Sequence, residues 1–340
     1  MIYSALLRPY ANSRYQAEAL KLAASELALL LEKGGIHADV RSESVAGADW
    51  LTFEASRLDE AQAALLSHMA HIYVLFERTE NGMLTPLEGH ADAYLGDDLP
   101  AVLKYKGKTN ETFTDYLINL AVCASDFDAD DVLTLADPMC GRGTTLFAAI
   151  NRGYHAVGVD CDAAAVDEAE KYFKRYLEYH RFKHTASEKS LTQNGKQAAR
   201  LHVFDYADTA EHFKAGNKRT LSLTSLDSTK LNVVCKKESV HLIVSDLPYG
   251  VQHAPGGKKG ISLEDMLYDV LPVWTRTLKR GGAMALSFNV NTLAPDMVRG
   301  MMAEWGLDVM DGAAYCGLEH WVEQAITRDV AVAVKRYSDD

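Results

Sequence analysis

The sequence contains no Cys-x-x-Cys pair. Its cysteines are five in number and far apart, at Cys123, Cys140, Cys161, Cys235 and Cys316. The odd count and the wide spacing argue against both a disulfide framework and a zinc ribbon. We therefore expect a reducing, cytoplasmic compartment.

Long apolar runs are missing as well. No stretch approaches the roughly 18 apolar residues of a membrane helix, and the amino terminus lacks the basic-then-apolar layout of a signal peptide. The sequence thus predicts neither a membrane segment nor export. Its 340 residues, 48% hydrophobic and 24% charged, match a globular chain of two domains or one large one.

Positive charge is scarce except in one segment. The whole chain has a net charge of −12, yet residues 171–259 hold 16 Lys and Arg against 8 Asp and Glu, a net charge of +8. A nucleic-acid backbone would be expected to bind at this segment. The alternative is a solvated, insertion-rich surface.

The first part of the chain predicts a small separate domain. Residues 1–80 show the order strand, helix, strand, strand, helix, strand, which is typical of a ferredoxin-like α+β unit. Residues 81–104 are rich in turn residues and predict a linker. Residues 105–340 then form the second predicted domain.

Strands and helices alternate in this second domain, which predicts an α/β fold with a mainly parallel, Rossmann-like sheet of seven strands. Two polar stretches, 185–199 and 214–238, predict surface insertions or partly disordered loops. The expected strands are 132–136, 155–160, 200–204, 240–245, 282–289, 306–315 and 324–335.

A glycine turn follows the first of these strands. Asp137 ends the strand, and Gly141 and Gly143 lead into a helix whose free N–H groups favour an anionic ligand group. A dinucleotide-binding motif would need a third glycine where Leu146 stands, and no Gly-Lys-Ser/Thr string follows. Pyrophosphate and P-loop phosphate binding are therefore disfavoured.

Three later strands also end in polar residues. Asp160 is placed to accept the hydroxyls of a ribose, and Asp205 to accept a hydrogen bond from an adenine amino group. The fourth strand ends in the string Asp246-Leu247-Pro248-Tyr249-Gly250. Since open α/β sheets bind ligands at the carboxyl ends of their strands, we expect these residues to surround one site. For Leu247 to Gly250 a simple strand-end turn is the alternative.

These motifs together resemble class I S-adenosylmethionine-dependent methyltransferases. The string Asp246-Leu247-Pro248-Tyr249 is similar to the [Asn/Asp]-Pro-Pro-Tyr signature of enzymes that methylate base amino groups. The run from Asp137 to Thr144 and the preceding run from Tyr105 to Thr114 resemble the THUMP-associated tRNA guanosine N2-methyltransferases. Residues 78–104 are too few for a THUMP domain, so a partner protein could supply RNA specificity.

The resemblance implies S-adenosylmethionine as cofactor and RNA, in particular tRNA, as partner. It places Asp137, Gly141 and Gly143 at the methionine end of the cofactor, Asp160 at its ribose and Asp205 at its adenine. It also implies a pocket wall of Thr109, Phe113 and Thr114, for which a helix start capped by Thr109 or Asn110 is the alternative.

The chemistry of amino methylation suggests roles for the last string. Asp246 and the Leu247 carbonyl would accept the two N–H bonds of the base, and Tyr249, after Pro248, would offer a flat face for stacking. A lid that touches phosphate, or a flexible linker, is expected directly after, with substrate contacts at Gly250, His253, Lys258 and Lys259.

No metal site is predicted, because His180 and His184 have neither a Glu between them in a HExxH pattern nor a cysteine nearby. Two other functions stay open. One is a DNA adenine or cytosine amino methyltransferase. The other is a non-catalytic RNA-binding subunit that keeps the fold.

Overall fold

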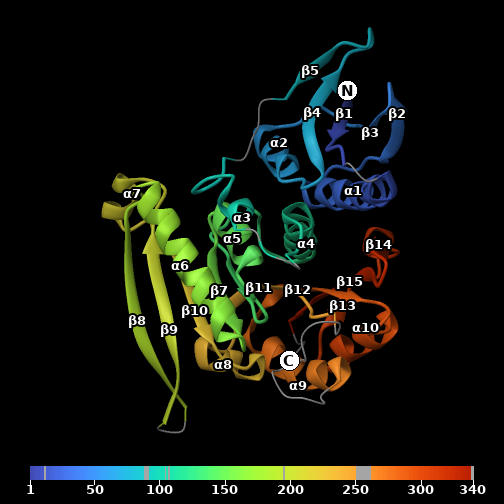
Figure 1. Ribbon diagram of the computed structural model, residues 1–340. Coiled ribbons are helices and arrows are strands. Elements are labelled where there is room, and N and C mark those ends of the chain that lie inside the picture. The colour runs from blue at the N-terminus through green and yellow to red at the C-terminus, as the bar shows by residue number, and fades with distance from the viewer. Residues whose placement is uncertain are drawn as a thin grey trace.

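A computed structural model describes residues 1–10, 13–87, 92–103, 105, 108–193, 196–249 and 262–337. It contains two sheets (Figure 1). The small sheet is formed near the amino terminus, and the large sheet is formed by strands from the rest of the chain. Among the described helices, none has both the length and the apolar character that a membrane crossing requires.

The small sheet confirms the predicted ferredoxin-like order. Its strands lie in the order β2-β3-β1-β4-β5, all antiparallel. The strand β5 falls within the predicted linker and extends the sheet by pairing with β4. The elements are β1 (Ile2–Leu7), α1 (Ser13–Lys33), β2 (Arg41–Val45), β3 (Ala48–Glu54), α2 (Glu60–Ser67), β4 (Ile72–Arg78) and β5 (Leu84–Pro86).

The large sheet begins after two helices, α3 (Leu99–Val102) and α4 (Glu111–Ala124). The first strands of this sheet and the helices between them are β6 (Thr134–Asp137), α5 (Thr144–Asn151), β7 (His155–Asp160), α6 (Ala163–Tyr179), β8 (His184–Gln193), β9 (Lys196–Tyr206), α7 (Ala210–Ala215) and β10 (Arg219–Ser225). The elements that follow in the chain are α8 (Leu231–Val234), β11 (Val240–Asp246), α9 (Leu263–Thr277), β12 (Leu278–Asn289), α10 (Pro295–Glu304), β13 (Asp308–Val309), β14 (His320–Glu323) and β15 (Ile326–Val334).

The strand order is β13-β15-β12-β11-β6-β7-β10-β9-β8, with β14 paired to β15. The five strands from β12 to β10 are mutually parallel, and β15 runs antiparallel to β12. This is the predicted Rossmann-like sheet, and β14 and β15 form an antiparallel hairpin at its end. Of the strand expected at 306–315, only Asp308–Val309 forms a strand, β13. Alternate residues of its central strands face opposite layers, so Leu242 and Val244 pack under α4 while Ile243 packs under α9.

The prediction for the third strand is wrong. Residues 200–204 belong to β9, which runs antiparallel to β10, and the third parallel strand is β10 itself. The stretches 185–199 and 214–238, predicted as insertions or loops, supply most of the β8–β9 hairpin and all of β10.

The small sheet is fastened to the large one through helix α4. The buried Glu26 carboxylate of α1 accepts hydrogen bonds from the Ala70 backbone at 2.9 Å and from Asn119 of α4 at 2.6 Å. The Asn119 side chain in turn accepts from Arg152 at 2.6 Å. These buried polar contacts join segments that are far apart in the sequence.

Candidate active site

Parallel strands bring the predicted acidic residues to one edge of the sheet. Asp137 pairs with Gly158, near the end of β7, and Asp160 is the last residue of that strand. Asp246 pairs with Ser287 near the end of β12. The carboxyl ends of β6, β7 and β11 thus form one cluster, as the sequence predicts.

The glycine loop after β6 leaves space above its backbone. Gly141 has φ +49°, and a Cβ added there would meet no atom within 4 Å. Its N–H donates to the Asp160 carboxylate at 2.7 Å, which fixes the loop against the end of β7. Gly143, with φ +87°, begins α5. An open glycine backbone beside a strand-end carboxylate fits a ligand with hydroxyl groups, such as the ribose of S-adenosylmethionine.

Asp137 lies beneath this loop. It is 3% exposed and accepts hydrogen bonds from the Met139 N–H at 3.1 Å and from the Ser245 hydroxyl at 2.8 Å. Burial raises the pKa of Asp137 to about 7, although these hydrogen bonds oppose the shift. A cation placed beside it would favour the ionised form.

Three hydroxyl groups surround the Asp246 carboxylate. Thr109 donates to Oδ2 at 2.6 Å, Ser287 donates to Oδ1 at 2.7 Å, and the Tyr249 phenol donates at 2.7 and 2.8 Å to the two oxygens. Burial, followed by the charge of Asp246, raises the pKa of Tyr249 well above its usual value, so the phenol stays protonated. The contact between Thr109 and Asp246 brings the segment before α4 to the end of β11.

Arg328 of β15 completes the cluster, and the sequence analysis missed it. The side chain is buried, with its guanidinium 4.1 Å from the centroid of the Phe113 ring and 5.3 Å from that of Tyr249. It donates to the Tyr249 hydroxyl at 2.7 Å and lies 3.6 Å from Asp246. Arg328 reaches the site only because β15 pairs with β12, a contact between distant segments of the chain. The sequence around Arg328 therefore contains no motif that would have identified it.

The other predicted pocket-wall residues serve the start of α4. Asn110 caps the helix by accepting from the N–H groups of Thr112 and Phe113, as the alternative interpretation expected. Thr114 is buried and donates to the Asn110 carbonyl at 3.2 Å. Phe113 is buried against Arg328. The segment is therefore both a capped helix start and a wall of the cluster.

Residues 247–249 continue directly from the site. Leu247 is buried, and its N–H donates to the Ser287 carbonyl at 2.8 Å, which holds the turn against β12. Pro248 follows and is partly buried. The substrate contacts predicted at Gly250, His253, Lys258 and Lys259 lie outside the described residues.

The prediction that Asp205 ends the third parallel strand is wrong. Because β9 is antiparallel to β10, Asp205 pairs with Thr220 near the start of β10, at the opposite edge of the sheet, and accepts its hydroxyl at 2.8 Å. The carboxylate that follows the true third strand is Asp227, two residues after Ser225. A correct assignment of β10 would have identified it.

The basic segment 171–259 also divides between the two edges. Lys236 and Lys237 precede β11 and therefore lie at the edge opposite Asp246. The neighbouring Glu238 and Ser239 donate backbone hydrogen bonds to the carbonyls of Arg276 and Thr277 at the end of α9. Closeness in sequence to Asp246 thus did not predict closeness in space.

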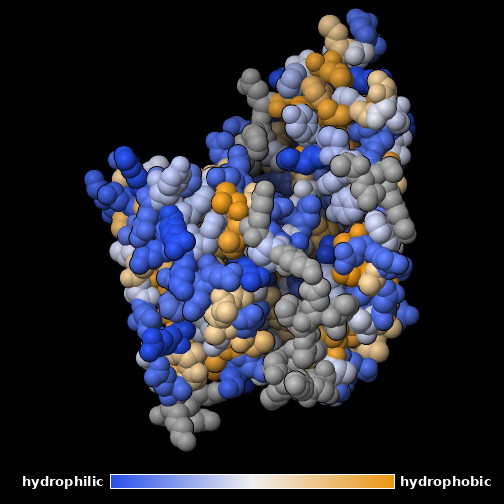
Figure 2. Space-filling model, in the orientation of Figure 1, coloured by the Kyte–Doolittle hydropathy of each residue, from blue (hydrophilic) through white to orange (hydrophobic). Residues whose placement is uncertain are grey.

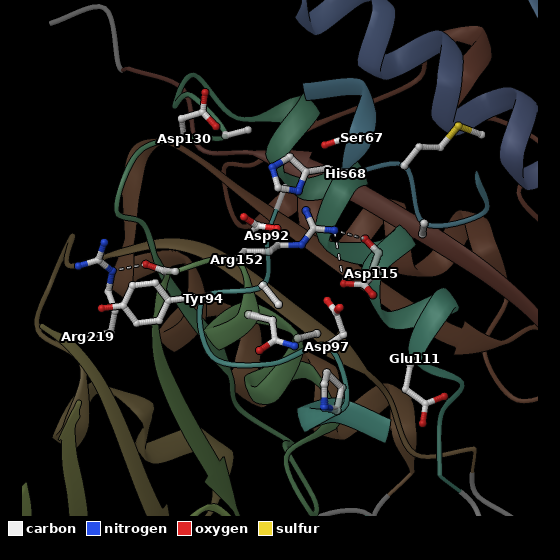
Figure 3. A pocket seen from close by; sticks show the side chains of 18 of the residues that line it. Ser67, His68, Asp92, Tyr94, Asp97, Glu111, Asp115, Asp130, Arg152 and Arg219 are labelled. Atoms are coloured by element: carbon white, nitrogen blue, oxygen red, sulfur yellow. Dashed lines mark hydrogen bonds and ion pairs between the residues drawn. The ribbon is translucent and has the colours of Figure 1, made fainter. Parts of the chain in front are cut away.

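A cavity of about 610 Å³ lies between residues of the amino-terminal part, such as Arg8 and His68, and residues of the large-sheet part. It is lined by His68 after α2, Asp92 and Tyr94 of the connection, and Arg152 and Arg219 (Figure 3). Arg152 is already bonded to Asp115 and Asn119. This cavity is lined by none of the residues predicted for the active site.

The family described as "RMKL-like, methyltransferase domain" matches residues 105–306, which include the glycine loop and Asp246. No curated protein matches the sequence.

Several solved structures are similar at low identity. TrmN from Thermus thermophilus is 15% identical, with a TM-score of 0.41 over 88% of this chain and 60% of TrmN. The rRNA methyltransferase AviRa from Streptomyces viridochromogenes is 14% identical, with a TM-score of 0.41 over 69% of this chain and 90% of AviRa. A TehB-like SAM-dependent methyltransferase from Corynebacterium glutamicum is 17% identical, with a TM-score of 0.36 over 66% and 97%.

Proposed function

Because the chain belongs to the RMKL-like methyltransferase domain family, we propose that it methylates an exocyclic amino group of an RNA base, namely the guanosine 2-amino group in tRNA. The observation that carries the proposal is the Asp246 carboxylate, set among aromatic rings beside the glycine loop and followed by Leu247-Pro248-Tyr249.

The cofactor of this class I methyltransferase is S-adenosylmethionine, which supplies a methyl group already activated on a sulfonium. We assign its ribose to Asp160, its methionine end to Asp137, Gly141 and Gly143, and its adenine to the loop that contains Asp227. The open space at Gly141 and the position of the half-buried Asp160 at the end of β7 support this assignment.

The acceptor side has to make a poor nucleophile react. The lone pair of an exocyclic amine is delocalised into the base, so hydrogen bonds from its two N–H groups to fixed acceptors favour attack. In our proposal Asp246 and the Leu247 carbonyl are these acceptors, and the Asp246 charge offsets the positive charge that builds on nitrogen.

The contacts of Asp246 say what the incoming base must displace. A carboxylate has about four acceptor positions, and Thr109, Tyr249 and Ser287 already use most of them. An amine that binds there replaces one hydroxyl donor. Tyr249 is the partner suited to leave, because Arg328 still donates to its oxygen and keeps the ring beside the site.

Labelled S-adenosylmethionine incubated with total RNA and, separately, with genomic DNA tests the proposal. Nucleoside analysis should find the label in N2-methylguanosine from the tRNA fraction. Label in DNA adenine or cytosine would overturn the substrate assignment. No transfer to any nucleic acid by a protein that binds the cofactor would overturn amino methylation of RNA altogether.

Asp246→Ala separates chemistry from binding in the same assay. Methyl transfer should fall about 100-fold or more, the scale for losing a positioned catalytic group, while cofactor affinity stays near that of the natural protein. A fully active Asp246→Ala protein would remove this carboxylate from the mechanism.

A further inference from the structure

The β8–β9 hairpin lies outside the seven strands β13, β15, β12, β11, β6, β7 and β10 that form the Rossmann-like part of the sheet. We call its two strands, His184–Gln193 and Lys196–Tyr206, the arm. It is the terminal ribbon of the sheet and is longer than the neighbouring β10 (Figure 1). None of the roles proposed so far for the site uses it.

The register shows that the arm reaches past the active edge. Ser225 of β10 pairs with Asp160, and Thr224 pairs with Leu201 of β9, so Arg200 lies level with the carboxylate assigned to the ribose. Residues 196–199 therefore continue beyond the end of β10. At about 3.3 Å per residue, this part of the arm extends more than 10 Å past that edge.

The arm is braced in this position. Leu191, Ala198 and Ala199 pack against the same apolar cluster as Leu231 and Val234 of α8. At about 4.8 Å between strands, the four steps from β9 to β11 place the arm roughly 19 Å from the strand of Asp246. A structured RNA that inserts one base at Asp246 spans that distance.

The surface of the arm offers the groups that bind phosphates. The arm carries three Lys and Arg against two Asp and Glu, and residues 171–183, which precede it in the chain, add five against one; the whole chain, by contrast, has a net charge of −12. Lys189 and Arg200 are exposed and lie on opposite faces of the ribbon, since Lys189 pairs with Leu201 and Arg200 with Ser190. Hydrophilic surface covers the region of α6, β8 and β9 (Figure 2).

The outer edge of β8 adds backbone donors. Within the described residues no strand pairs with that edge, and the exposed hydroxyls of Ser187, Ser190 and Thr192 belong to the same strand. Backbone N–H groups, hydroxyls and cations are the usual contacts to a nucleic-acid backbone. The exposed carboxylate of Glu188, also on β8, lies 3.5 Å from Arg200.

From these observations we infer that the arm binds the phosphate backbone of the RNA substrate and holds it across the active edge. This inference rests on the proposed function, because it assumes an RNA acceptor at Asp246. The arm thereby supplies part of the surface that binds the RNA.

The test neutralises two cations in each of two places. In the arm variant, Lys189→Gln and Arg200→Gln are combined; in the matched control, Lys236→Gln and Lys237→Gln are combined at the opposite edge. The probe is unfractionated tRNA, with binding measured between 50 and 200 mM salt. The arm variant should bind about tenfold more weakly, with a salt slope shallower by about 1.5, while the control changes neither.

Cofactor affinity and melting temperature should be unchanged in both variants, so a loss of RNA binding cannot be a folding defect. Equal losses in arm variant and control would reduce the effect to net charge and overturn the inference. Normal RNA affinity in the arm variant, or a change in its sedimentation coefficient that reveals a protein–protein interface instead, would also overturn it. If no RNA is methylated while the arm variant still loses tRNA binding, the proposed function fails and the arm remains an RNA-binding element.

Discussion

Asp160 is held by the two loops that follow β6 and β7, since it accepts from the N–H groups of Gly141 and Asp162 at 2.7 and 2.8 Å. A ribose would add hydrogen bonds to the same charged group. We expect Asp160→Ala to weaken S-adenosylmethionine binding by about 1.5–3 kcal/mol in calorimetry. Asp205→Ala is the control, because its carboxylate lies at the opposite edge. Equal affinity in all three proteins would exclude Asp160 from the ribose.

Arg328 acts on the site through its planar guanidinium, which contacts two aromatic rings and a phenol oxygen. A lysine keeps the positive charge but has neither the planar set of N–H donors nor the flat group that stacks on the aromatic rings. Arg328→Lys should therefore lower kcat about tenfold and leave cofactor affinity intact.

The control for Arg328 is Arg299→Lys, which changes an arginine bonded to the neighbouring Asp329 and not to the cluster. The double variant Arg328→Lys with Tyr249→Phe should be little worse than the poorer single variant if the arginine works through that phenol. Strictly additive losses would contradict this role.

Asp137 makes stability depend on pH. Its pKa of about 7 in the folded protein is above the value of an unfolded aspartate, so the folded state holds a proton that the unfolded state releases. This contribution is fully present below about pH 4 and is lost as pH rises to about 7. In urea titrations, Asp137→Asn should flatten the fall in unfolding free energy over that range. An unchanged slope would show that Asp137 is ionised throughout.

At the scale of the element, strands β6, β7 and β11 were predictable because each combines a buried apolar run with a polar end. The third parallel strand, β10, was not predictable in this way. The run Leu201–Tyr206 contains Val203 and Phe204 and has the stronger strand pattern, whereas β10 alternates leucine with Ser and Thr. Neither pattern encodes chain direction, which depends on pairing with a distant strand. This is why Asp205 was predicted in place of Asp227.

Close packing inside β7 gives a prediction for that strand. A Cβ at Gly158 would clash with the side chain of Leu146 and lie 2.8 Å from that of Leu223, whereas one at Gly300 of α10 would meet nothing within 4 Å. Gly158→Ala should cost about 1–3 kcal/mol of unfolding free energy through overpacking. Gly300→Ala should instead stabilise by up to about 1 kcal/mol, because alanine favours the helix. Chemical denaturation of both variants checks the pair.

At the scale of the whole molecule, the contact between α1 and α4 couples the two units. Asn119→Ala would remove one partner from the buried Glu26 and one from Arg152. We expect a loss of about 1–3 kcal/mol, the cost of unsatisfied buried polar groups. Calorimetry should show one unfolding transition for the natural protein and an earlier, separate transition of residues 1–86 in the variant. The exposed Asn232→Ala is the control.

The same contact sets an order of events during synthesis. Asn119 is 93 residues beyond Glu26 in the chain, and it is the residue of α4 that donates a hydrogen bond to the Glu26 carboxylate. At about 5–20 residues per second, the ribosome delivers it some 5–20 s after Glu26. Until then Glu26 has the Ala70 backbone and His71 as its partners, and the amino-terminal sheet has no helix α4 to pack against. Because α4 precedes β6, β7 and β11 in the chain, the surface on which the amino-terminal sheet packs is synthesised before the strands that carry the candidate site.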